Sequence, residues 1–289
     1  MKANVQHLGL EQRDRSFECY WVRSPEFGFH WHYHRALEIT YVVQGRGIRM
    51  VGDNVSYFSS GDLVLLGSNL PHTWISDDEF NANSEHMQVV VLQFLPELFG
   101  EEWLALPEMR RIRSLLQKVR RGISFSTKTS EQAGNLLRQL TKENGVFGLQ
   151  RLMSVFHVLS EDEETVLLSS KGFTPVLNEV TEERLLRVCQ YMHEHFTTVV
   201  RLDTLAALAN MNTSAFCRFF SRATGQTVTD YLNDLRIGKA CNLLIDRPKM
   251  TISQVAHTSG YSSQTLFNRC FRRKKGVTPR EFRTQFKGS

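Results

Sequence analysis

The sequence lacks the features of a membrane-spanning, secreted or disulfide-stapled protein. No apolar run in its 289 residues approaches the roughly 20 residues needed to span a bilayer, and the segment 1–18 is polar, without the apolar core of a secretory signal. The five cysteines are an odd number, widely spaced and without a C-x-x-C pair, which argues against a disulfide framework or a zinc knuckle. These absences predict a cytoplasmic protein whose cysteines are small buried apolar residues.

Charge is distributed unevenly along the chain. The contents of hydrophobic residues (41%) and charged residues (22%) are ordinary for a globular protein, and the length suffices for two domains. Residues 181–289 contain 17 Lys and Arg against 8 Asp and Glu, whereas the rest of the chain contains 18 against 22. A basic domain attached to a mildly acidic one is typical of a nucleic-acid binder with a separate sensing module.

Residues 18–95 show short β-rich runs separated by turns. The turns are rich in Gly, Asn, Asp and Ser and recur every 8 to 12 residues, a spacing typical of an antiparallel sandwich or barrel. The predicted strands are 38–43, 48–51, 55–58, 63–66 and 87–94.

After Pro96 the spacing of apolar residues changes to about 3.6, which predicts amphipathic helices. Three such helices are expected, over 107–121, 130–141 and 148–159. They either cap the barrel or supply a dimer interface by antiparallel packing.

The segment 181–289 contains an internal near-repeat, which predicts two copies of one structural unit. Six residues of the first copy, Arg218, Phe220, Gly225, Thr227, Asp230 and Tyr231, recur 51 positions later as Arg269, Phe271, Gly276, Thr278, Glu281 and Phe282. The pattern of each copy predicts a short helix, a tight turn and a second helix. A small residue lies where the two helices cross, Ala206 in the first copy and Ala256 in the second. Thr213 and Ser214 are the expected N-caps of the second helix in the first copy.

The second helix of each copy carries polar residues opposite an aromatic stripe. Arg can make a bidentate contact to guanine, Gln or Asn to adenine, and Thr a methyl contact to thymine. The predicted base-contacting residues are Ser214, Cys217, Arg218 and Arg222 in the first copy, and Ser263, Gln264, Thr265, Asn268, Arg269 and Arg272 in the second. The alternatives are a solvated helix face and, for Arg218 and Arg269, a structural ion pair.

A further set of basic residues near the end of the chain suits the phosphates of DNA. Its members are Arg272, Arg273, Lys274, Lys275, Arg280, Arg283 and Lys287.

These two copies and their spacing resemble the DNA-binding domain of AraC/XylS transcription regulators over residues 181–286. The clearest match is the segment 260–283, which includes Gly260-Tyr261-Ser262-Ser263-Gln264, Phe271 and Gly276-Val277-Thr278-Pro279. The resemblance implies seven helices, a long one over about Val228 to Leu244, and recognition helices that enter successive major grooves about 34 Å apart. The first copy departs from the pattern in its small residues, so the second carries much of the base recognition or the first acts through Arg218.

Histidines alternate along a strand-like segment of the first domain, so they point to one face of a sheet. The pattern His32-x-His34-x3-Glu38-x6-Gly45 resembles the first cupin motif, and His72 lies in a degraded second one. The sensory cupins of this family bind a small organic effector, which implies a pocket lined by His30, His32, His34, Glu38, Arg46, His72 and Trp74. The alternatives are a structural role for these residues and a metal on His32, His34, Glu38 and His72.

The predicted fold class is therefore α+β, a cupin-like barrel with helices followed by an all-α domain. The expected organisation is an effector-sensing barrel (1–95), a helical dimerisation segment (96–171), a linker (172–180) and a DNA-binding domain (181–289) with helix-turn-helix units at about 202–224 and 251–275.

The expected function is that of a sequence-specific transcription regulator rather than an enzyme: an effector-responsive activator that controls carbohydrate or related small-molecule metabolism. Its expected partners are double-stranded DNA, a small effector such as a sugar, RNA polymerase and a second copy of the chain, with no cofactor and no membrane. The rival hypotheses are a metal-dependent cupin enzyme with an attached DNA-binding domain, and a non-specific nucleic-acid binder.

Overall fold

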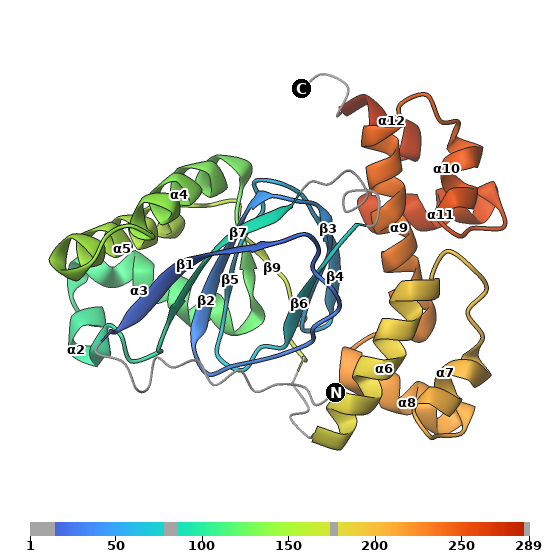
Figure 1. Ribbon diagram of the computed structural model, residues 1–289, viewed down its shortest axis with the longest axis horizontal. Helices are drawn as coiled ribbons and strands as arrows, with labels where there is room; N and C mark the ends of the chain where they lie inside the picture. The colour runs from blue at the N-terminus through green and yellow to red at the C-terminus, as the bar shows by residue number, and fades with distance from the viewer. Residues whose placement is uncertain (1–14, 78–85, 174–178, 286–289) are drawn as a thin grey trace. The chain divides into compact units, whose positions relative to one another are not determined.

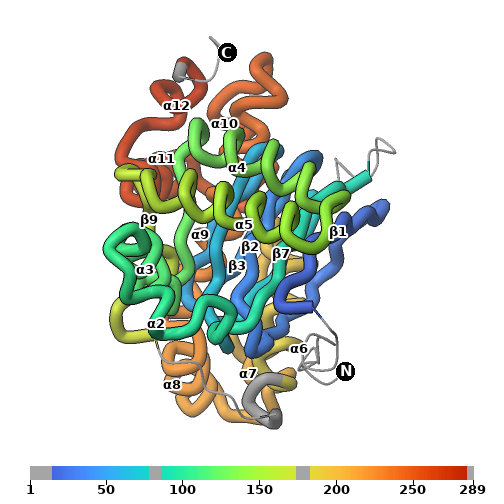
Figure 2. The backbone as a smooth tube through the Cα atoms, turned by 90° about the vertical axis from the view of Figure 1, so that its left-hand side faces the viewer, coloured from blue at the N-terminus to red at the C-terminus, as the bar shows by residue number. Residues whose placement is uncertain are grey.

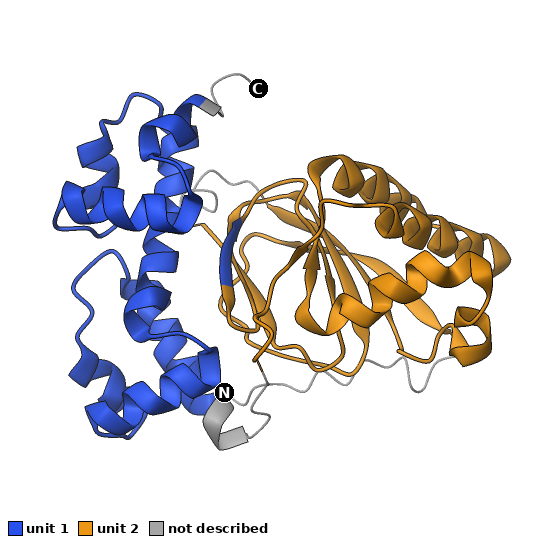
Figure 3. Ribbon diagram, turned by 180° about the vertical axis from the view of Figure 1, so that it is seen from behind, with its two compact units in different colours: residues 1–2, 55–57, 176–289 blue, residues 3–54, 58–175 orange. Residues whose placement is uncertain are grey.

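The computed structural model describes residues 15–77, 86–173 and 179–285 (Figure 1). They fall into two compact units divided near residue 175 (Figure 3). The first unit along the chain is orange in Figure 3, apart from residues 55–57, and the second unit is blue. Among the described helices, none combines the length and the apolar character that crossing a membrane requires. The predicted linker lies partly at residues 174–178, outside the described residues.

The first unit is built on two antiparallel sheets. The larger has the order β1-β7-β2-β5-β8-β9 and the smaller the order β4-β3-β6. The strands are β1 (Phe17–Ser24), β2 (Leu37–Gln44), β3 (Gly47–Val51), β4 (Asn54–Phe58), β5 (Leu63–Leu66), β6 (His72–Ser76), β7 (Met87–Phe94), β8 (Ile123–Ser124) and β9 (Val166–Leu167).

Both faces of the larger sheet are buried, which explains the continuous apolar runs in its central strands. Side chains such as Val42, Val64 and Val89 join the smaller sheet in one core. Side chains on the opposite face of the same strands, such as Ile39 and Leu65, pack against the helices in a second core. Figure 2 shows α4 and α5 lying across this second face.

The helices of the first unit follow the predicted pattern with small shifts. They are α2 (Gly100–Leu104), α3 (Arg110–Lys118) between the 3₁₀ turns η2 (Pro107–Met109) and η3 (Val119–Arg121), α4 (Thr127–Leu140) and α5 (Gly145–Ser160). The short strands β8 and β9 come from the segment predicted to be helical, and they extend the sheet beside β5. The predicted segments 1–95 and 96–171 therefore form one folded unit.

The second unit consists of helices only. The described residues from 179 onward form the seven that the sequence predicted: α6 (Glu179–His195), α7 (Leu202–Leu208), α8 (Thr213–Thr224), α9 (Val228–Asp246), α10 (Ile252–Thr258), α11 (Gln264–Lys275) and α12 (Pro279–Gln285). The long helix α9 ends two residues beyond the predicted end and is buried along most of its length. The predicted mixed fold, a β-rich first domain and an all-α second one, is confirmed.

Helix α4 approaches β2 so closely that one of its positions has no room for a side chain. A Cβ atom on Gly134 would lie 2.3 Å from the Cζ atom of Tyr41, whose ring is buried in the core. Glycine is otherwise unfavourable inside a helix by about 0.5–1 kcal/mol relative to alanine, so the contact explains its presence.

We expect Gly134→Ala to lower the free energy of unfolding of the first unit by about 1–3 kcal/mol, because the methyl group must displace the Tyr41 ring. All four tryptophans lie between residues 21 and 103, so tryptophan fluorescence during denaturant unfolding reports on this unit alone. The exposed neighbour Gln132→Ala on the same helix should change the value by less than about 0.5 kcal/mol. A gain in stability for Gly134→Ala would contradict the close contact.

Candidate functional site

The two predicted helix-turn-helix units have matching backbones. The amide of Met211 donates to the carbonyl of Ala206 at 2.9 Å, and that of Tyr261 to Ala256 at 3.0 Å. Both alanines are buried, so the paired helices cross closely. The first helices, α7 and α10, are offset by 50 residues and the second ones, α8 and α11, by 51, so the second turn is one residue longer.

The second helix of each unit begins at a side-chain cap and ends at a glycine. Asn212 caps α8 by accepting from the amide of Ala215 at 2.8 Å, and Ser263 caps α11 by accepting from the amide of Leu266. The prediction of Thr213 or Ser214 as the first cap is wrong, since the side chain of Asn212, one residue earlier, accepts the backbone hydrogen bond. Gly225 and Gly276 end the two helices at positive φ, 72° and 76°.

Aromatic rings anchor each second helix in the same way. In the first copy the ring of Phe220 lies 5.8 Å from Phe216 and 5.5 Å from Tyr231. In the second copy Phe271 lies 5.6 Å from Phe267 and 5.5 Å from Phe282. Because this face is anchored in the core, the opposite face of each helix is held toward solvent.

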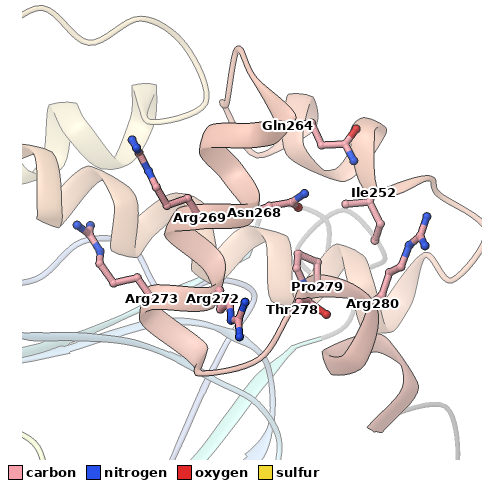
Figure 4. A pocket seen from close by; sticks show the side chains of 9 residues that line it. All are labelled: Ile252, Gln264, Asn268, Arg269, Arg272, Arg273, Thr278, Pro279 and Arg280. Carbon is pink, nitrogen blue, oxygen red and sulfur yellow. The ribbon is translucent and has the colours of Figure 1, made fainter.

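That opposite face carries the predicted base-contacting residues. Cys217 is half-buried, Ser263 is also the helix cap, and the other predicted contacts are exposed: Ser214, Arg218, Arg222, Gln264, Thr265, Asn268, Arg269 and Arg272. Among the described residues, Arg218 and Arg269 form no ion pair, so the structure gives no support to that alternative. Figure 4 shows Gln264, Asn268 and Arg272 with Arg280 of α12 around a hollow at the surface of the second unit.

Two of the basic residues predicted to bind phosphates, Arg273 and Lys274, form ion pairs within the domain. Lys274 Nζ lies 2.6 Å from Asp234 Oδ1 and Arg273 lies 3.2 Å from Asp230 Oδ1, so both tie α11 to α9. Burial raises the pKa of Asp234 although Lys274 opposes the shift. Lys287, also predicted to bind phosphate, lies outside the described residues.

Arg236 joins the two helix-turn-helix units. Its Nε atom donates to the carbonyl of Phe196 at 2.7 Å and its terminal nitrogen to that of Thr198 at 3.1 Å, both in the loop after α6. Its guanidinium lies 5.7 Å from the ring centroid of Tyr261, in the turn of the second helix-turn-helix unit. A Cβ on Gly260 would lie 2.7 Å from the carbonyl of Phe196, so this turn also packs directly on the loop.

The predicted effector residues of the first unit mostly come together as a compact cluster. The ring of His32 lies 4.9 Å from His30, 5.9 Å from His34 and 4.2 Å from His72. Trp74 lies 5.6 Å from His72. The strand-like segment is not a regular strand, because it carries only isolated bridge positions, one of which pairs His32 with His72.

Arg46 is the predicted member that the structure does not bring to the cluster. Its carbonyl accepts from the amide of Asp77, just beyond the end of β6 opposite His72. Its neighbour Arg49 is buried and ion-paired with Asp62.

Glu38 is the buried acceptor at the centre of the cluster. Its Oε2 atom accepts from His34 Nε2 at 3.0 Å and from the Gln93 amide at 2.8 Å, and its Oε1 atom accepts from the Thr40 hydroxyl at 2.6 Å. The sequence did not single out Thr40 or Gln93. Thr40 lies on the same face of β2 two residues on, a detectable signal, whereas Gln93 is 55 residues away and aligned only by the β2–β7 register.

The pKa values of Glu38, His34 and His72 shift in different directions within the cluster. Burial would raise the pKa of Glu38, but the hydrogen bond from His34 and the neighbouring histidines hold that pKa below its usual range. Burial opposes a charge on His34, yet its bond to Glu38 raises the pKa of its imidazole. Burial, reinforced by His32, lowers the pKa of His72 to about 3. Both ring nitrogens of His34 face acceptors, the Ala36 carbonyl and Glu38, an arrangement that favours the charged imidazolium. His72 beside it is a neutral base.

Comparison with known proteins covers both units. Residues 16–155 match the model of an AraC-like ligand binding domain, and residues 205–285 match that of a helix-turn-helix domain. The HTH-type transcriptional activator RhaS of Escherichia fergusonii is 26% identical over 267 residues, 90% of this chain and 90% of that protein. The Msm operon regulatory protein of Streptococcus mutans is 22% identical over 290 residues, 99% of this chain and 94% of that protein.

Two solved structures are also similar. The DNA-binding domain of AdpA, in complex with a target DNA, is 29% identical with a TM-score of 0.34 and covers 36% of this chain and 93% of its own. ToxT from Vibrio cholerae is 15% identical with a TM-score of 0.36 and covers 95% of this chain and 99% of its own.

We expect Arg236→Ala to destabilise the second unit by about 2–3 kcal/mol, because two carbonyls lose a charged donor. Circular dichroism at 222 nm measures the loss, while the tryptophan fluorescence transition of the first unit should not move. Arg222→Ala removes the same side chain from an exposed site and should cost less than about 0.5 kcal/mol. Equal effects of the two substitutions would show that Arg236 does not fasten the two helix-turn-helix units together.

Proposed function

This chain belongs to the AraC/XylS family of transcription regulators, and we propose that it activates transcription by binding a specific DNA site under the control of a small effector. The observation that carries the proposal is the duplicated helix-turn-helix, in which matched cores hold two polar helix faces toward solvent. The basic charge of residues 181–289 adds attraction for DNA phosphates.

The second helix-turn-helix unit is the stronger candidate for base recognition. Helix α11 exposes Gln264, Asn268 and Arg269, whose side chains can each make bidentate contacts to base edges in the major groove. Helix α8 exposes Ser214 and Arg218 in the corresponding region, with shorter side chains around Arg218. We therefore assign most of the sequence discrimination to α11 and a smaller share, through Arg218, to α8.

The effector is proposed to bind in the N-terminal barrel, and a sugar is the candidate that the sequence suggested. Trp74 supplies aromatic surface beside the histidine cluster, which suits the apolar face of a sugar ring. The relatives named above are transcription regulators, and an activator of this kind would also contact RNA polymerase. We propose no enzymatic activity for the chain.

We expect Arg269→Ala to weaken binding to the best DNA site by about 5-fold to 150-fold, since a bidentate contact to guanine is worth about 1–3 kcal/mol. Selection from a random DNA pool first defines the site, and fluorescence anisotropy then compares wild type and variant on it and on a scrambled duplex. Affinity for the scrambled duplex should fall far less.

The matched control is Arg113→Ala, which removes the same charge from the exposed face of α3 in the other unit. It should leave both affinities unchanged. If Arg269→Ala lowered the affinity for the selected site and the scrambled duplex by the same factor, the chain would be a non-specific binder.

The chain is also proposed to form a homodimer through the start of α5. Val146 and Phe147 are 81% and 75% exposed, adjacent and large, and Leu149 continues the apolar surface beside them. Apolar surface of this kind is normally covered by a partner. A second copy of the same helix fits the symmetric pairing of most homodimers.

We expect Phe147→Glu to raise the dimer dissociation constant by at least about tenfold, because it places a charge in an apolar contact. Sedimentation velocity over a range of protein concentrations measures the change. Gln150→Glu adds the same charge at an exposed site one turn of the helix away and should have a smaller effect. A wild-type chain that stays monomeric at high concentration would exclude this interface.

A further inference from the structure

The three histidines His32, His34 and His72 are held in one tautomeric arrangement by the backbone. Each Nδ1 atom lies 2.8–2.9 Å from a carbonyl oxygen, that of His30, Ala36 and Leu70 respectively. A carbonyl oxygen only accepts, so each Nδ1 carries a hydrogen and donates it. Each Nε2 atom is then the ring nitrogen left to face the cluster. Metal-binding histidines are oriented by this same kind of outer hydrogen bond.

The three inward-facing nitrogens converge on one point. One ring nitrogen from each of these histidines lies within 4.8 Å of the others, although they come from two separate stretches of chain. His72 is 1% exposed, and its Nε2 atom makes no hydrogen bond to any described residue. The rings of His32 and His72 are 4.2 Å apart, so two acceptor lone pairs share a confined space. A cation between them satisfies both.

Glu38 supplies the fourth donor. Its Oε2 atom lies 3.0 Å from His34 Nε2 and its Oε1 atom lies 3.9 Å from His72 Nε2. Adjacent ligands of a six-coordinate ion with bonds of about 2.1 Å stand about 3 Å apart, which the first distance matches. Thr40 and Gln93 hold the carboxylate in place from behind, as the outer partners of metal ligands do.

We propose that this cluster is a binding site for one divalent transition-metal ion, held by His32, His34, His72 and Glu38. Three imidazoles with one carboxylate suit zinc, cobalt, nickel or ferrous iron, and not magnesium or calcium, which take oxygen ligands. The inference goes beyond the proposed DNA-binding function, because none of these residues belongs to the helix-turn-helix units.

The hydrogen-bonded network alone does not account for the arrangement. In the metal-free cluster the hydrogen bond between His34 Nε2 and Glu38 satisfies these two residues, but it leaves the Nε2 atoms of His32 and His72 facing each other without a donor among the described residues. Binding of the ion displaces the proton from His34 Nε2, which then becomes a ligand. Glu38 itself is not free to bind a sugar hydroxyl, since both of its oxygens are already engaged by protein donors.

The test is a Co²⁺ titration of the full chain after treatment with EDTA and removal of the chelator. We expect visible absorption bands from nitrogen-coordinated cobalt that saturate at one ion per chain, and elemental analysis should find the same ratio after gel filtration. His32→Ala, which removes the most accessible ligand, should weaken binding by at least about tenfold. Glu38→Gln, which keeps the shape of the side chain but removes its charge, should do the same.

The matched control is His157→Ala, which removes an exposed histidine from α5 and should leave the titration unchanged. Circular dichroism and tryptophan fluorescence in EDTA establish that each variant is folded. A wild-type chain that takes up no cobalt, or binding that survives both His32→Ala and Glu38→Gln, would overturn the proposal. Equal loss in His157→Ala would do so as well. DNA binding measured in EDTA tests the proposed function separately, so the two failures are distinguishable.

Discussion

The close crossing of two short helices over a buried alanine sets the geometry on which both DNA-facing surfaces depend. At Ala206 and at Ala256 the small side chain lets the backbones approach until the turn closes with a hydrogen bond to the alanine carbonyl. The second helix of each unit then has one possible orientation, because its phenylalanines must enter the core. Larger residues at these two positions would separate the helices and change the direction in which the polar face of the second helix points.

A second constraint acts in the first unit, where the larger sheet is buried on both sides. Its central strands have no polar face to give to solvent, so the few polar side chains within it, such as Glu38 and Gln93, must satisfy one another. This concentrates donors and acceptors at one place in an otherwise apolar structure. The histidine cluster is thus a product of the same layering that makes the unit stable, and its residues are held more rigidly than surface groups would be.

The sequence predicted those parts of the structure that follow from local periodicity. The aromatic stripes at Phe216 and Phe267 and the alternation of His30, His32 and His34 repeat at short, regular intervals, so their faces were predictable. Strands β8 and β9 were missed because two residues carry no period. The cap at Asn212 was misplaced by one residue, since Asn, Thr and Ser stand side by side there and all can cap a helix.

Long-range partners could not be predicted for a different reason. The Lys274–Asp234 and Arg236–Phe196 contacts join residues about 40 positions apart, and only the packing of α9 brings them together. The same holds for Gln93 on Glu38, which the strand register decides.

The unequal faces of α8 and α11 give the binding site of a single chain a direction. Two identical recognition helices related by a two-fold axis recognise a palindrome, whose two ends are the same. Here Ser214 and Cys217 on one helix correspond to Thr265 and Asn268 on the other, so the two halves of the DNA site must differ. A site of this kind has a left and a right end, and its reversal in a promoter would turn the bound protein to face the opposite way.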